Sequence, residues 1–186
     1  MVKKNVITEI FKVAIILFVI TAAAAAILAE VNAVTAPVIA ENDRKAQEIA
    51  MKEVLPDATM FEKLEYEPNE SSSVTEVYLS DAGYAVKSAP KGYGGAISMI
   101  VGVDNDLKVT GVEIISQSET AGLGAKCTDS EFKAQFVGKT ENIAVTKNGA
   151  KENEVDAISS ATITSKAVTK GVNDAINAAK DEKGDK

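Results

Sequence analysis

An uncharged apolar run from Val13 to Ala29 constrains the fold of this chain more than any other feature of its sequence. The run is near the lower length limit for a membrane-spanning helix, and Lys12 at its edge can extend its charged end to the membrane surface. The flanking charges differ in sign, with Lys3, Lys4 and Lys12 before the run and Glu30 and Glu41 after it. The positive-inside rule therefore predicts a single-pass anchor with a cytoplasmic N-terminus and an extracytoplasmic remainder.

A cleaved signal peptide is the alternative interpretation of this run, because it is rich in alanine and offers small-residue cleavage sites. The core of a signal peptide is usually shorter, so we expect a retained anchor over residues 1–30. In either case, the bulk of the protein is expected outside the cytoplasm.

The rest of the chain divides into a stalk, a domain and a tail. We expect Thr35-Ala36-Pro37 to interrupt the first helix or to begin a new one, because proline suits a first helical turn. The apolar residues from Val38 to Val54 have helical spacing, so residues 31–56 are predicted to form a stalk helix that docks on the domain. Residues 57–180 are predicted to form the domain, and residues 181–186 a charged, frayed tail.

The domain is predicted to be α+β, with an antiparallel sheet and flanking helices. Short apolar runs between turn residues predict strands at Val74–Leu79, Tyr84–Lys87, Ala96–Val103, Val109–Ile115 and Asn142–Val145. Asp104-Asn105-Asp106 has a turn composition, so the third and fourth of these strands should form a hairpin. Thr128 and Glu131 have the spacing of a capping box, which predicts a short helix through Phe136.

Composition excludes several function classes. The formal net charge is −7 and there is no basic stripe, so nucleic-acid binding is not expected. The chain has no histidine and one cysteine, Cys127, which removes His-based triads, most transition-metal sites and iron–sulfur clusters; we expect Cys127 to be a packed residue rather than a reactive thiol. No loop pairs a nucleophile with a general base, so we expect no catalytic residue and no metal site. Any redox chemistry would need an organic cofactor.

The stretch from Asp156 to Ser165 is rich in hydroxyl groups and precedes a predicted helix. Beyond Ser165, apolar residues recur at helical spacing through Ala179, and either Ser165 or Thr164 could cap this helix. Thr162 would then lie just before the helix N-terminus, where free N–H groups and partial positive charge favour a phosphate. A capped helix without a ligand is the competing interpretation, and composition alone favours it.

Two further loops are rich in glycine, GYGG at residues 92–95 and SETAGLG at residues 118–124. Such loops most often only make tight turns. Glycine also lets backbone N–H groups approach a planar ring or a phosphate, and clustered N–H groups bind anions. Tyr93 could cover a flavin, and Glu119 and Thr120 could bond to a cofactor edge, but each could equally be a plain surface residue.

Together and in this order, the three loops resemble the FMN-binding domain of the G subunits of Rnf ion-translocating electron-transport complexes. They also resemble the related C subunits of sodium-pumping NADH:quinone reductases. The chain has GYGGAI at 92–97, ETAGLG at 119–124 and SSATIT at 159–164, where the family has GYGG-x-I, E-T-P-G-L-G and S-G-A-T-x-T. The resemblance covers the whole chain, including the single anchor. The short length of the chain is more like that of the Rnf G subunits than that of the longer quinone-reductase C subunits. The chain departs from the family at Ser160, in place of glycine, and at Ala121, in place of proline.

The resemblance implies that FMN is joined by a phosphoester to the Thr162 hydroxyl, by a separate flavin transferase that uses FAD and Mg²⁺. The implied cofactor-binding residues are Gly92, Tyr93, Gly94, Gly95, Glu119, Thr120, Gly122, Leu123, Gly124, Asp156, Ser159, Ser160, Ala161, Thr162 and Thr164. The implied function is electron relay in a complex of the bacterial cell membrane that links ferredoxin and NAD and translocates Na⁺ or H⁺. The chain would be a non-autonomous redox subunit of that oxidoreductase, with iron–sulfur and flavin subunits as partners.

Two other functions are compatible with the sequence. A stand-alone extracytoplasmic flavin carrier could export electrons without a pump, and a membrane-anchored binding module without cofactor could use the hydroxyl-rich loop only as a helix cap. Genomic neighbours distinguish the first from the Rnf interpretation. Intact mass distinguishes the second, because bound FMN adds to the mass of the chain.

Overall fold

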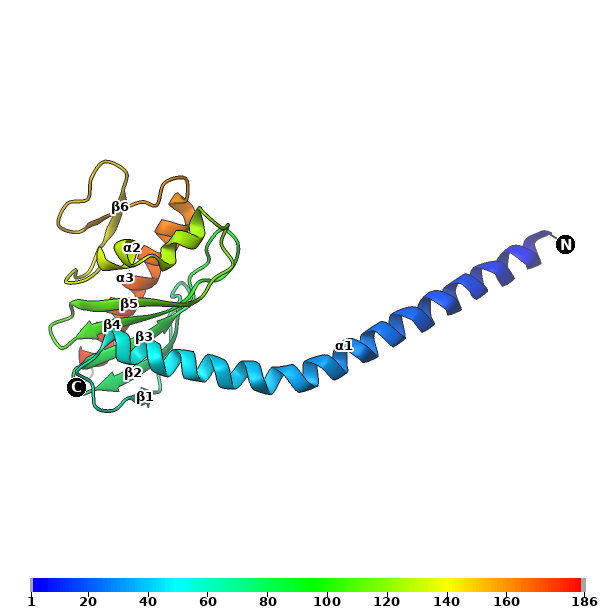
Figure 1. Cartoon of the computed structure of the whole chain (residues 1–186), viewed down its shortest axis with the longest axis horizontal. Helices are drawn as coiled ribbons and strands as arrows, with labels where there is room; N and C mark the ends of the chain where they lie inside the picture. Colours follow the sequence, from blue (N-terminus) through cyan, green and yellow to red (C-terminus); the bar gives the residue numbers. More distant parts are fainter. Residues whose placement is uncertain (1, 185–186) are drawn as a thin grey trace. The chain divides into compact units, whose positions relative to one another are not determined.

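The computed structural model describes residues 2–184, with side chains from residue 8 onward. It contains two compact units, one with the residues up to Arg44 and one with the residues from Lys45 onward (Figure 1). Lys3 and Lys4, which support the predicted orientation, lie outside the described side chains, as do the last two residues of the predicted tail.

Helix α1 runs from Val2 to Val54 without interruption, although it contains Pro37. The predicted break at Thr35-Ala36-Pro37 is therefore wrong. Pro37 has no N–H group, so it removes one hydrogen bond of the helical ladder, but the alanine-rich stretch before it has high helix propensity. The hydroxyl of Thr35 donates to the Val31 carbonyl at 2.9 Å within the same turn. One lost bond is not enough to end a helix of this length.

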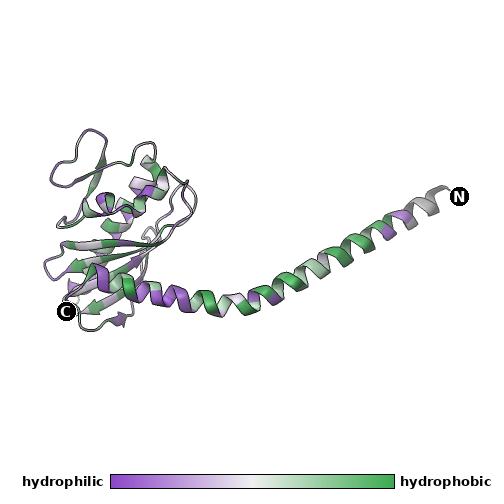
Figure 2. Ribbon diagram, viewed as in Figure 1, coloured by the Kyte–Doolittle hydropathy of each residue, from purple (hydrophilic) through white to green (hydrophobic). Residues whose placement is uncertain are grey.

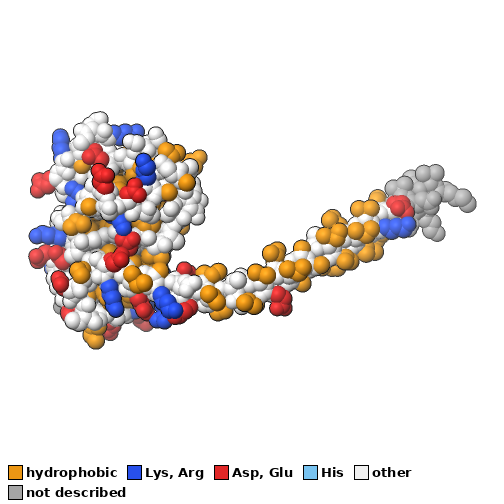
Figure 3. Space-filling model, viewed as in Figure 1, with side chains coloured by type: hydrophobic (Ala, Val, Ile, Leu, Met, Phe, Trp, Pro, Cys, Tyr) orange, Lys and Arg blue, Asp and Glu red, His pale blue; other side chains and the backbone are white. Residues whose placement is uncertain are grey.

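The apolar part of α1 can cross a membrane by its length and composition. Its most apolar stretch of 18 residues has at most two charged residues, and none of it is buried. Large side chains such as Phe11, Leu17 and Phe18 are exposed along it. Much of this part of α1 is coloured hydrophobic in the ribbon of Figure 2, and hydrophobic side chains cover its surface in Figure 3. Within residues 2–184, α1 is the one helix with these properties, in agreement with the predicted anchor.

A five-stranded antiparallel sheet lies at the centre of the second unit, with the strands in sequence order. The strands are β1 (Glu62–Leu64), β2 (Val74–Ser80), β3 (Gly83–Ser88), β4 (Ser98–Asp104) and β5 (Val109–Ser116). Strands β2 to β5 confirm the predicted strands and the β4–β5 hairpin, whose turn is closed by N–H groups of Asp106 and Lys108 donating to the Asp104 carboxylate. Strand β1 was not predicted, because a three-residue, mostly exposed edge strand carries no hydrophobic pattern.

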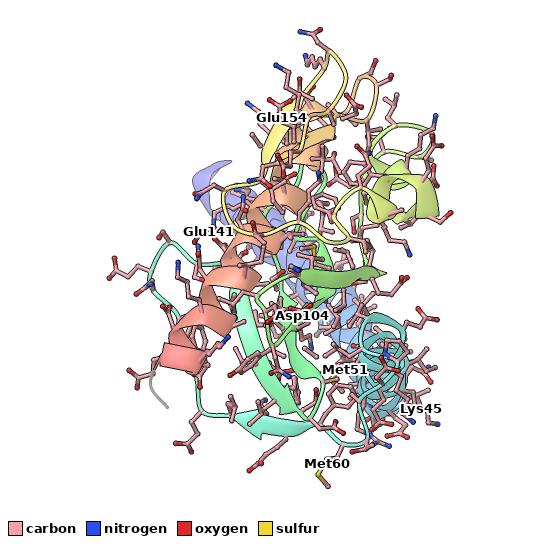
Figure 4. The ribbon with its side chains drawn as sticks, turned by 90° about the vertical axis from the view of Figure 1, so that its left-hand side faces the viewer. Lys45, Met51, Met60, Asp104, Glu141 and Glu154 are labelled. Atoms are coloured by element: carbon pink, nitrogen blue, oxygen red, sulfur yellow. The ribbon has the colours of Figure 1, made fainter. Side chains whose placement is uncertain are left out.

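The sheet carries a hydrophobic layer on each face. Side chains alternate between faces along a strand, so the neighbours Ala85 and Val86 on β3 belong to different clusters. The larger cluster contains Val86 and is covered by helix α3 (Thr162–Gly184) through residues such as Val172. The smaller cluster contains Ala85 and is covered by the last turns of α1. Figure 4 shows the sheet between α3 and the α1 turns that carry Met51.

The last turns of α1 are part of the core of this domain. Met51 and Val54 are buried, and the Thr110 hydroxyl donates to the Val54 carbonyl at 2.5 Å. Gly102 permits this approach, because a Cβ at that position would lie 2.6 Å from the same carbonyl oxygen. The end of α1, which falls within the predicted stalk, packs on the domain through buried residues from Ala50 onward, and the Gln47 side chain donates to Glu76 and Tyr78 of β2.

Strands β6 (Ala144–Thr146) and β7 (Glu154–Asp156) form a separate parallel pair. Strand β6 corresponds to the predicted strand at 142–145, whereas β7 was not predicted because three residues are too few for a periodic pattern. The pairing sets Thr146 beside Asp156, and the Ala157 N–H donates to the Thr146 carbonyl at 2.8 Å. The segments that follow the two strands therefore begin side by side.

A 3-10 helix, η1 (Gly124–Thr128), precedes the short helix α2 (Ser130–Ala134). The predicted capping box is wrong: Asp129 is the N-cap residue of α2, and no side chain caps this helix. The Thr128 hydroxyl donates to the Ala125 carbonyl instead, because Thr128 closes η1. Helix α2 also ends earlier than predicted.

Candidate functional site

The three predicted loops meet at a cavity of about 500 Å³. Its lining residues are Tyr93, Glu119, Thr120, Leu123, Gly124, Ser160, Ala161, Thr162, Ile163 and Thr164. All of these except Ile163 belong to the predicted set. Ile163 was missed because the family motif leaves its position unspecified, although an apolar residue between two motif threonines was visible in the sequence. Six predicted residues do not line the cavity: Gly92, Gly94, Gly95, Gly122, Asp156 and Ser159.

The carboxylate of Glu119 connects the three loops. It accepts a hydrogen bond from the Gly94 N–H at 2.8 Å and another from the Thr164 hydroxyl. The side chain is buried, with 8% of the residue exposed. The sequence placed Glu119 in the site as a possible cofactor contact, but both of these donors are protein groups, one in the first loop and one in the third.

The pKa of Glu119 reflects both its burial and its hydrogen bonds. Burial acts to raise the pKa, and the bonds from the Thr164 hydroxyl and from the backbone of Gly94 and Tyr93 lower it by more, so the net pKa is below the ordinary value for glutamate. Glu119 is therefore a carboxylate at neutral pH. It brings a negative charge to the wall of the cavity.

Close approach of the loops requires glycine at three positions. A Cβ on Gly92 would lie 2.4 Å from a carboxylate oxygen of Glu119. A Cβ on Gly94 would lie 2.1 Å from the Ser118 carbonyl oxygen, which belongs to the rigid backbone of the second loop. A Cβ on Gly124 would lie 2.7 Å from both the Glu119 carboxylate and the Thr164 hydroxyl. These glycines leave room for the Glu119 contacts, and Gly124 also lines the cavity.

Helix α3 begins at Thr162, which corrects two predictions about its N-terminus. Thr162 is the first helical residue rather than the residue before the helix. Neither Thr164 nor Ser165 is the cap: both are buried inside the first turn. The Ser165 hydroxyl accepts from the Ile158 N–H at 2.9 Å and donates to the Ala161 carbonyl at 3.0 Å, so it fixes the loop before the helix.

Ser160 occupies the left-handed region of backbone space, with φ of 62°. Glycine adopts this conformation without steric cost, whereas other residues do so with strain. The motif that this loop resembles has glycine at this position, whereas this chain has serine. Ser160 lines the cavity beside Thr162.

Asp156 lies outside the main cavity and holds a neighbouring turn. Its carboxylate oxygens accept hydrogen bonds from the N–H groups of Gly149 and Ala150, each at 3.1 Å. A second cavity of about 320 Å³ lies next to this turn. Its lining residues are Lys147, Ala157, Ile158, Ser159, Ser160 and Thr162. Lys147 was not predicted, because no motif marks it and only the pairing of β6 with β7 brings it to Thr162.

Three lining residues of the main cavity expose large apolar or aromatic surfaces. The exposed fractions are 73% for Tyr93, 56% for Ile163 and 41% for Leu123. Each comes from a different loop. Clustered apolar side chains at a cavity, with few polar groups among them, are typical of a site for an organic cofactor.

Cys127 is fully buried, as expected for a packed residue. Burial raises the pKa of its thiol to about 11, and the nearby charge of Glu119 contributes in the same direction. The thiol is therefore protonated and unreactive at neutral pH.

Comparisons with known proteins identify the family. A family profile described as RnfG N-terminal region matches residues 1–54, and one described as FMN-binding domain matches residues 92–177. The G subunit of the Na⁺-translocating ferredoxin:NAD⁺ oxidoreductase complex of Acetobacterium woodii is 41% identical over 184 residues, covering 88% of each chain. This chain belongs to the family of Rnf complex G subunits. The resemblance drawn from the three loops is confirmed, and the region matched by the FMN-binding profile spans all of them.

Other Rnf G subunits are similar over most of their length. The G subunit of the proton-translocating ferredoxin:NAD⁺ oxidoreductase complex of Clostridium ljungdahlii is 36% identical over 156 residues, covering 81% of this chain and 80% of the relative. The G subunit of the ion-translocating oxidoreductase complex of Methanosarcina acetivorans is 36% identical over 179 residues, covering 91% of this chain and 94% of the relative.

The fold is also found in solved structures. The C subunit of the Na⁺-translocating NADH-quinone reductase from Parabacteroides distasonis superposes with a TM-score of 0.54 at 22% identity, covering 74% of this chain and 88% of that chain. NqrC from Shewanella oneidensis gives a TM-score of 0.50 at 18% identity, covering 75% of this chain and 74% of that chain. These structures confirm the α+β fold with its antiparallel sheet and flanking helices.

Proposed function

We propose that this chain is the FMN-carrying electron-relay subunit of a membrane-bound complex that links ferredoxin and NAD and translocates Na⁺ or H⁺. The single observation that carries the proposal is the cavity at which Tyr93, Glu119 and Thr162 meet from three separate loops. The names of the related G subunits from Acetobacterium woodii and Clostridium ljungdahlii support the ferredoxin and NAD assignment.

The residues at the main cavity fit FMN. The volume of about 500 Å³ lies within the roughly 300–1,000 Å³ of small-molecule sites. The exposed side chains of Tyr93, Leu123 and Ile163 suit the faces of a planar ring. FMN supplies one-electron and two-electron redox chemistry when bound. The chain would position the ring, shield it from water and set its electrostatic surroundings.

Thr162 is the proposed attachment residue, and the environment of the two motif threonines supports this choice. Thr162 is half-buried and lines both cavities, so its hydroxyl can be reached. Thr164 is 1% exposed, and its hydroxyl already donates to Glu119. A transferase acting from outside therefore meets Thr162 and not Thr164.

Attachment would be a phosphoryl transfer catalysed by a separate flavin transferase. The bond formed joins Thr162 Oγ1 to the phosphorus of the FMN half of FAD, and the bond broken is the pyrophosphate linkage. AMP leaves, and a base of the transferase takes the hydroxyl proton. This chain needs no catalytic base of its own, in keeping with the absence of histidine from the sequence.

The proposed topology places the N-terminus in the cytoplasm, α1 in the membrane and the FMN-binding domain outside. The charge asymmetry around residues 13–29 supports it. The proposed division is an anchor at residues 1–30, a stalk at 31–56 and the domain at 57–180, with other flavin and iron–sulfur subunits of the complex as partners.

The test is the intact mass and in-gel fluorescence of the full-length chain, co-expressed with a flavin transferase. We expect the mass of the chain to increase by one bound FMN and the gel to show a fluorescent band that Thr162→Ala abolishes. Thr162→Ser, which keeps a hydroxyl at the same atom, is the matched control and should keep the flavin. A fluorescent band in Thr162→Ala would contradict the attachment residue. An unmodified mass in the parent chain would contradict the flavin role and favour a binding module without cofactor.

A further inference from the structure

Ser160 and Thr162 line both cavities, and the two cavities differ in chemistry. The main cavity contains the Glu119 carboxylate and the apolar side chains of Tyr93, Leu123 and Ile163. The second cavity is lined by Lys147, Ser159, Ser160 and Thr162, whose side chains carry one ammonium group and three hydroxyls. A group joined to Thr162 Oγ1 therefore has an acidic, apolar cavity and a basic, hydroxyl-rich cavity within reach of the same atom.

The parallel pair of β6 and β7 builds the second cavity. Lys147 directly follows β6 and Ala157 directly follows β7, and the Ala157 N–H donates to the Thr146 carbonyl at 2.8 Å. Asp156 fixes the turn after Lys147 by accepting from the N–H groups of Gly149 and Ala150. This gives Asp156, which does not line the main cavity, a defined role in holding the turn that carries Lys147.

The charges that line the two cavities favour different halves of FMN. A phosphodiester keeps one negative charge at neutral pH, and the chain as a whole has a formal net charge of −7. Glu119 repels that charge from the main cavity, whereas Lys147 is, among the described residues, the one cation that lines either cavity. Hydroxyl donors such as those of Ser159 and Ser160 bind phosphate oxygens. The apolar lining of the main cavity suits the ring instead.

We propose that the second cavity is a phosphate subsite, in which Lys147 and the hydroxyls of Ser159 and Ser160 bind the phosphodiester on Thr162. This assignment rests on the proposed function and adds a residue, Lys147, outside the family motifs. It also assigns the ring to the main cavity, with Thr162 at the boundary. The ligand class is a phosphate monoester or diester of a flavin.

Riboflavin and FMN differ only by the phosphate, so together they isolate this subsite. The probe is their non-covalent binding to the full-length Thr162→Ala chain in detergent, measured by quenching of flavin fluorescence. Adding Lys147→Gln should weaken FMN binding about two- to fivefold and leave riboflavin binding unchanged, as expected for an exposed charge pair. Lys151→Gln is the matched control, since Lys151 is an exposed lysine of the same connection that lines neither cavity, and it should change neither. Equal weakening of both flavins, or of neither, would overturn the subsite.

A second measurement uses the covalent flavin and does not depend on non-covalent affinity. The ³¹P NMR resonance of the phosphodiester is recorded for the flavin-loaded parent chain, Lys147→Gln and Lys151→Gln. We expect Lys147→Gln to shift the resonance and Lys151→Gln to leave it in place. If the flavin-loaded Lys147→Gln variant has the same ³¹P chemical shift as the parent chain, the subsite is overturned and the proposed function stands. If intact mass shows that the parent chain carries no flavin, both the subsite and the proposed function are overturned.

Discussion

The Thr164 hydroxyl donates a hydrogen bond to the Glu119 carboxylate across 45 residues of sequence. The same carboxylate accepts from the Gly94 N–H, so one buried side chain connects the three loops around the main cavity. The walls of the cavity are therefore held by bonds within the protein. This arrangement also occupies the hydroxyl of Thr164 and leaves that of Thr162 accessible.

Replacing Glu119 should destabilise the domain. In Glu119→Ala, the buried Thr164 hydroxyl and the Gly94 N–H lose their charged acceptor, which should lower the free energy of unfolding by about 2–4 kcal/mol. Urea unfolding followed by circular dichroism measures this loss. Glu131→Ala, at an exposed glutamate of α2, is the control and should change stability by less than about 0.5 kcal/mol. Equal losses in the two variants would mean that Glu119 does not hold the loops together.

Two adjacent glycines of the first loop should respond differently to alanine. A Cβ at Gly94 would overlap the Ser118 carbonyl oxygen at 2.1 Å, so Gly94→Ala should force the first two loops apart and cost about 1–3 kcal/mol. A Cβ at Gly95 would lie 3.9 Å from its nearest neighbour, so Gly95→Ala should be nearly neutral. Melting temperature and flavin content after co-expression with the transferase distinguish them. Similar behaviour of both variants would contradict the close approach at Gly94.

Introducing glycine at residue 160 should stabilise the chain. The φ of 62° strains Ser160, and glycine removes a strain of about 1 kcal/mol, partly offset by the greater freedom of glycine in the unfolded chain. Ser160→Gly should therefore raise the melting temperature. Ser159→Gly is the matched control: its φ is not positive, so it should lower the melting temperature or leave it unchanged. If Ser160→Gly lowers the melting temperature as much as the control does, the serine hydroxyl contributes more stability than the backbone strain costs.

Glu76 should make the domain sensitive to acid. Burial acts to raise its pKa, but hydrogen bonds from Lys63, Tyr78 and Gln47 lower it by more, to about 2. Because the folded pKa is below the ordinary value of 4.5, Glu76 contributes stability above pH 4.5, and this contribution is lost as the pH falls toward 2. Urea unfolding between pH 2 and pH 7 should show this loss. Glu76→Gln should be less stable at pH 7 and should lose less between pH 4.5 and 2; a profile parallel to that of the parent chain would contradict the assignment.

The last turns of α1 should be needed for a stable soluble domain. A chain that begins at residue 57 lacks Met51, Val54 and Leu55, and each buried apolar side chain of this size contributes about 1.5–3 kcal/mol. Their sum is comparable with the total stability of a domain, about 5–15 kcal/mol, so this chain should unfold or aggregate. A chain that begins at residue 45 keeps the second unit whole and should fold. Cooperative thermal unfolding of the shorter chain would show that the α1 turns are dispensable.

Local patterns predicted much of the fold. Short apolar runs bounded by turn residues marked β2 to β5, and the turn at Asp104 marked the β4–β5 hairpin, because these signals depend only on neighbours in sequence. The patterns failed where tertiary contacts or short elements decide. Pro37 does not end α1, Thr128 closes η1 rather than capping α2, and β7 is too short to carry a pattern. The start of α3 was misplaced, because the Ser165 hydroxyl bonds backward to residues 158 and 161 from inside the first turn.

The sequence by itself determined the apolar N-terminal helix, the α+β class, the lack of histidine and the family motifs around Thr162. These follow from composition, periodicity and residue order, all of which are local. Only the tertiary structure decided that Glu119 bonds Thr164, that Thr162 is the accessible threonine, and that Lys147 reaches the second cavity. Those relationships join residues far apart in the chain. They depend on how the strands pair and on how closely glycine lets the backbones approach.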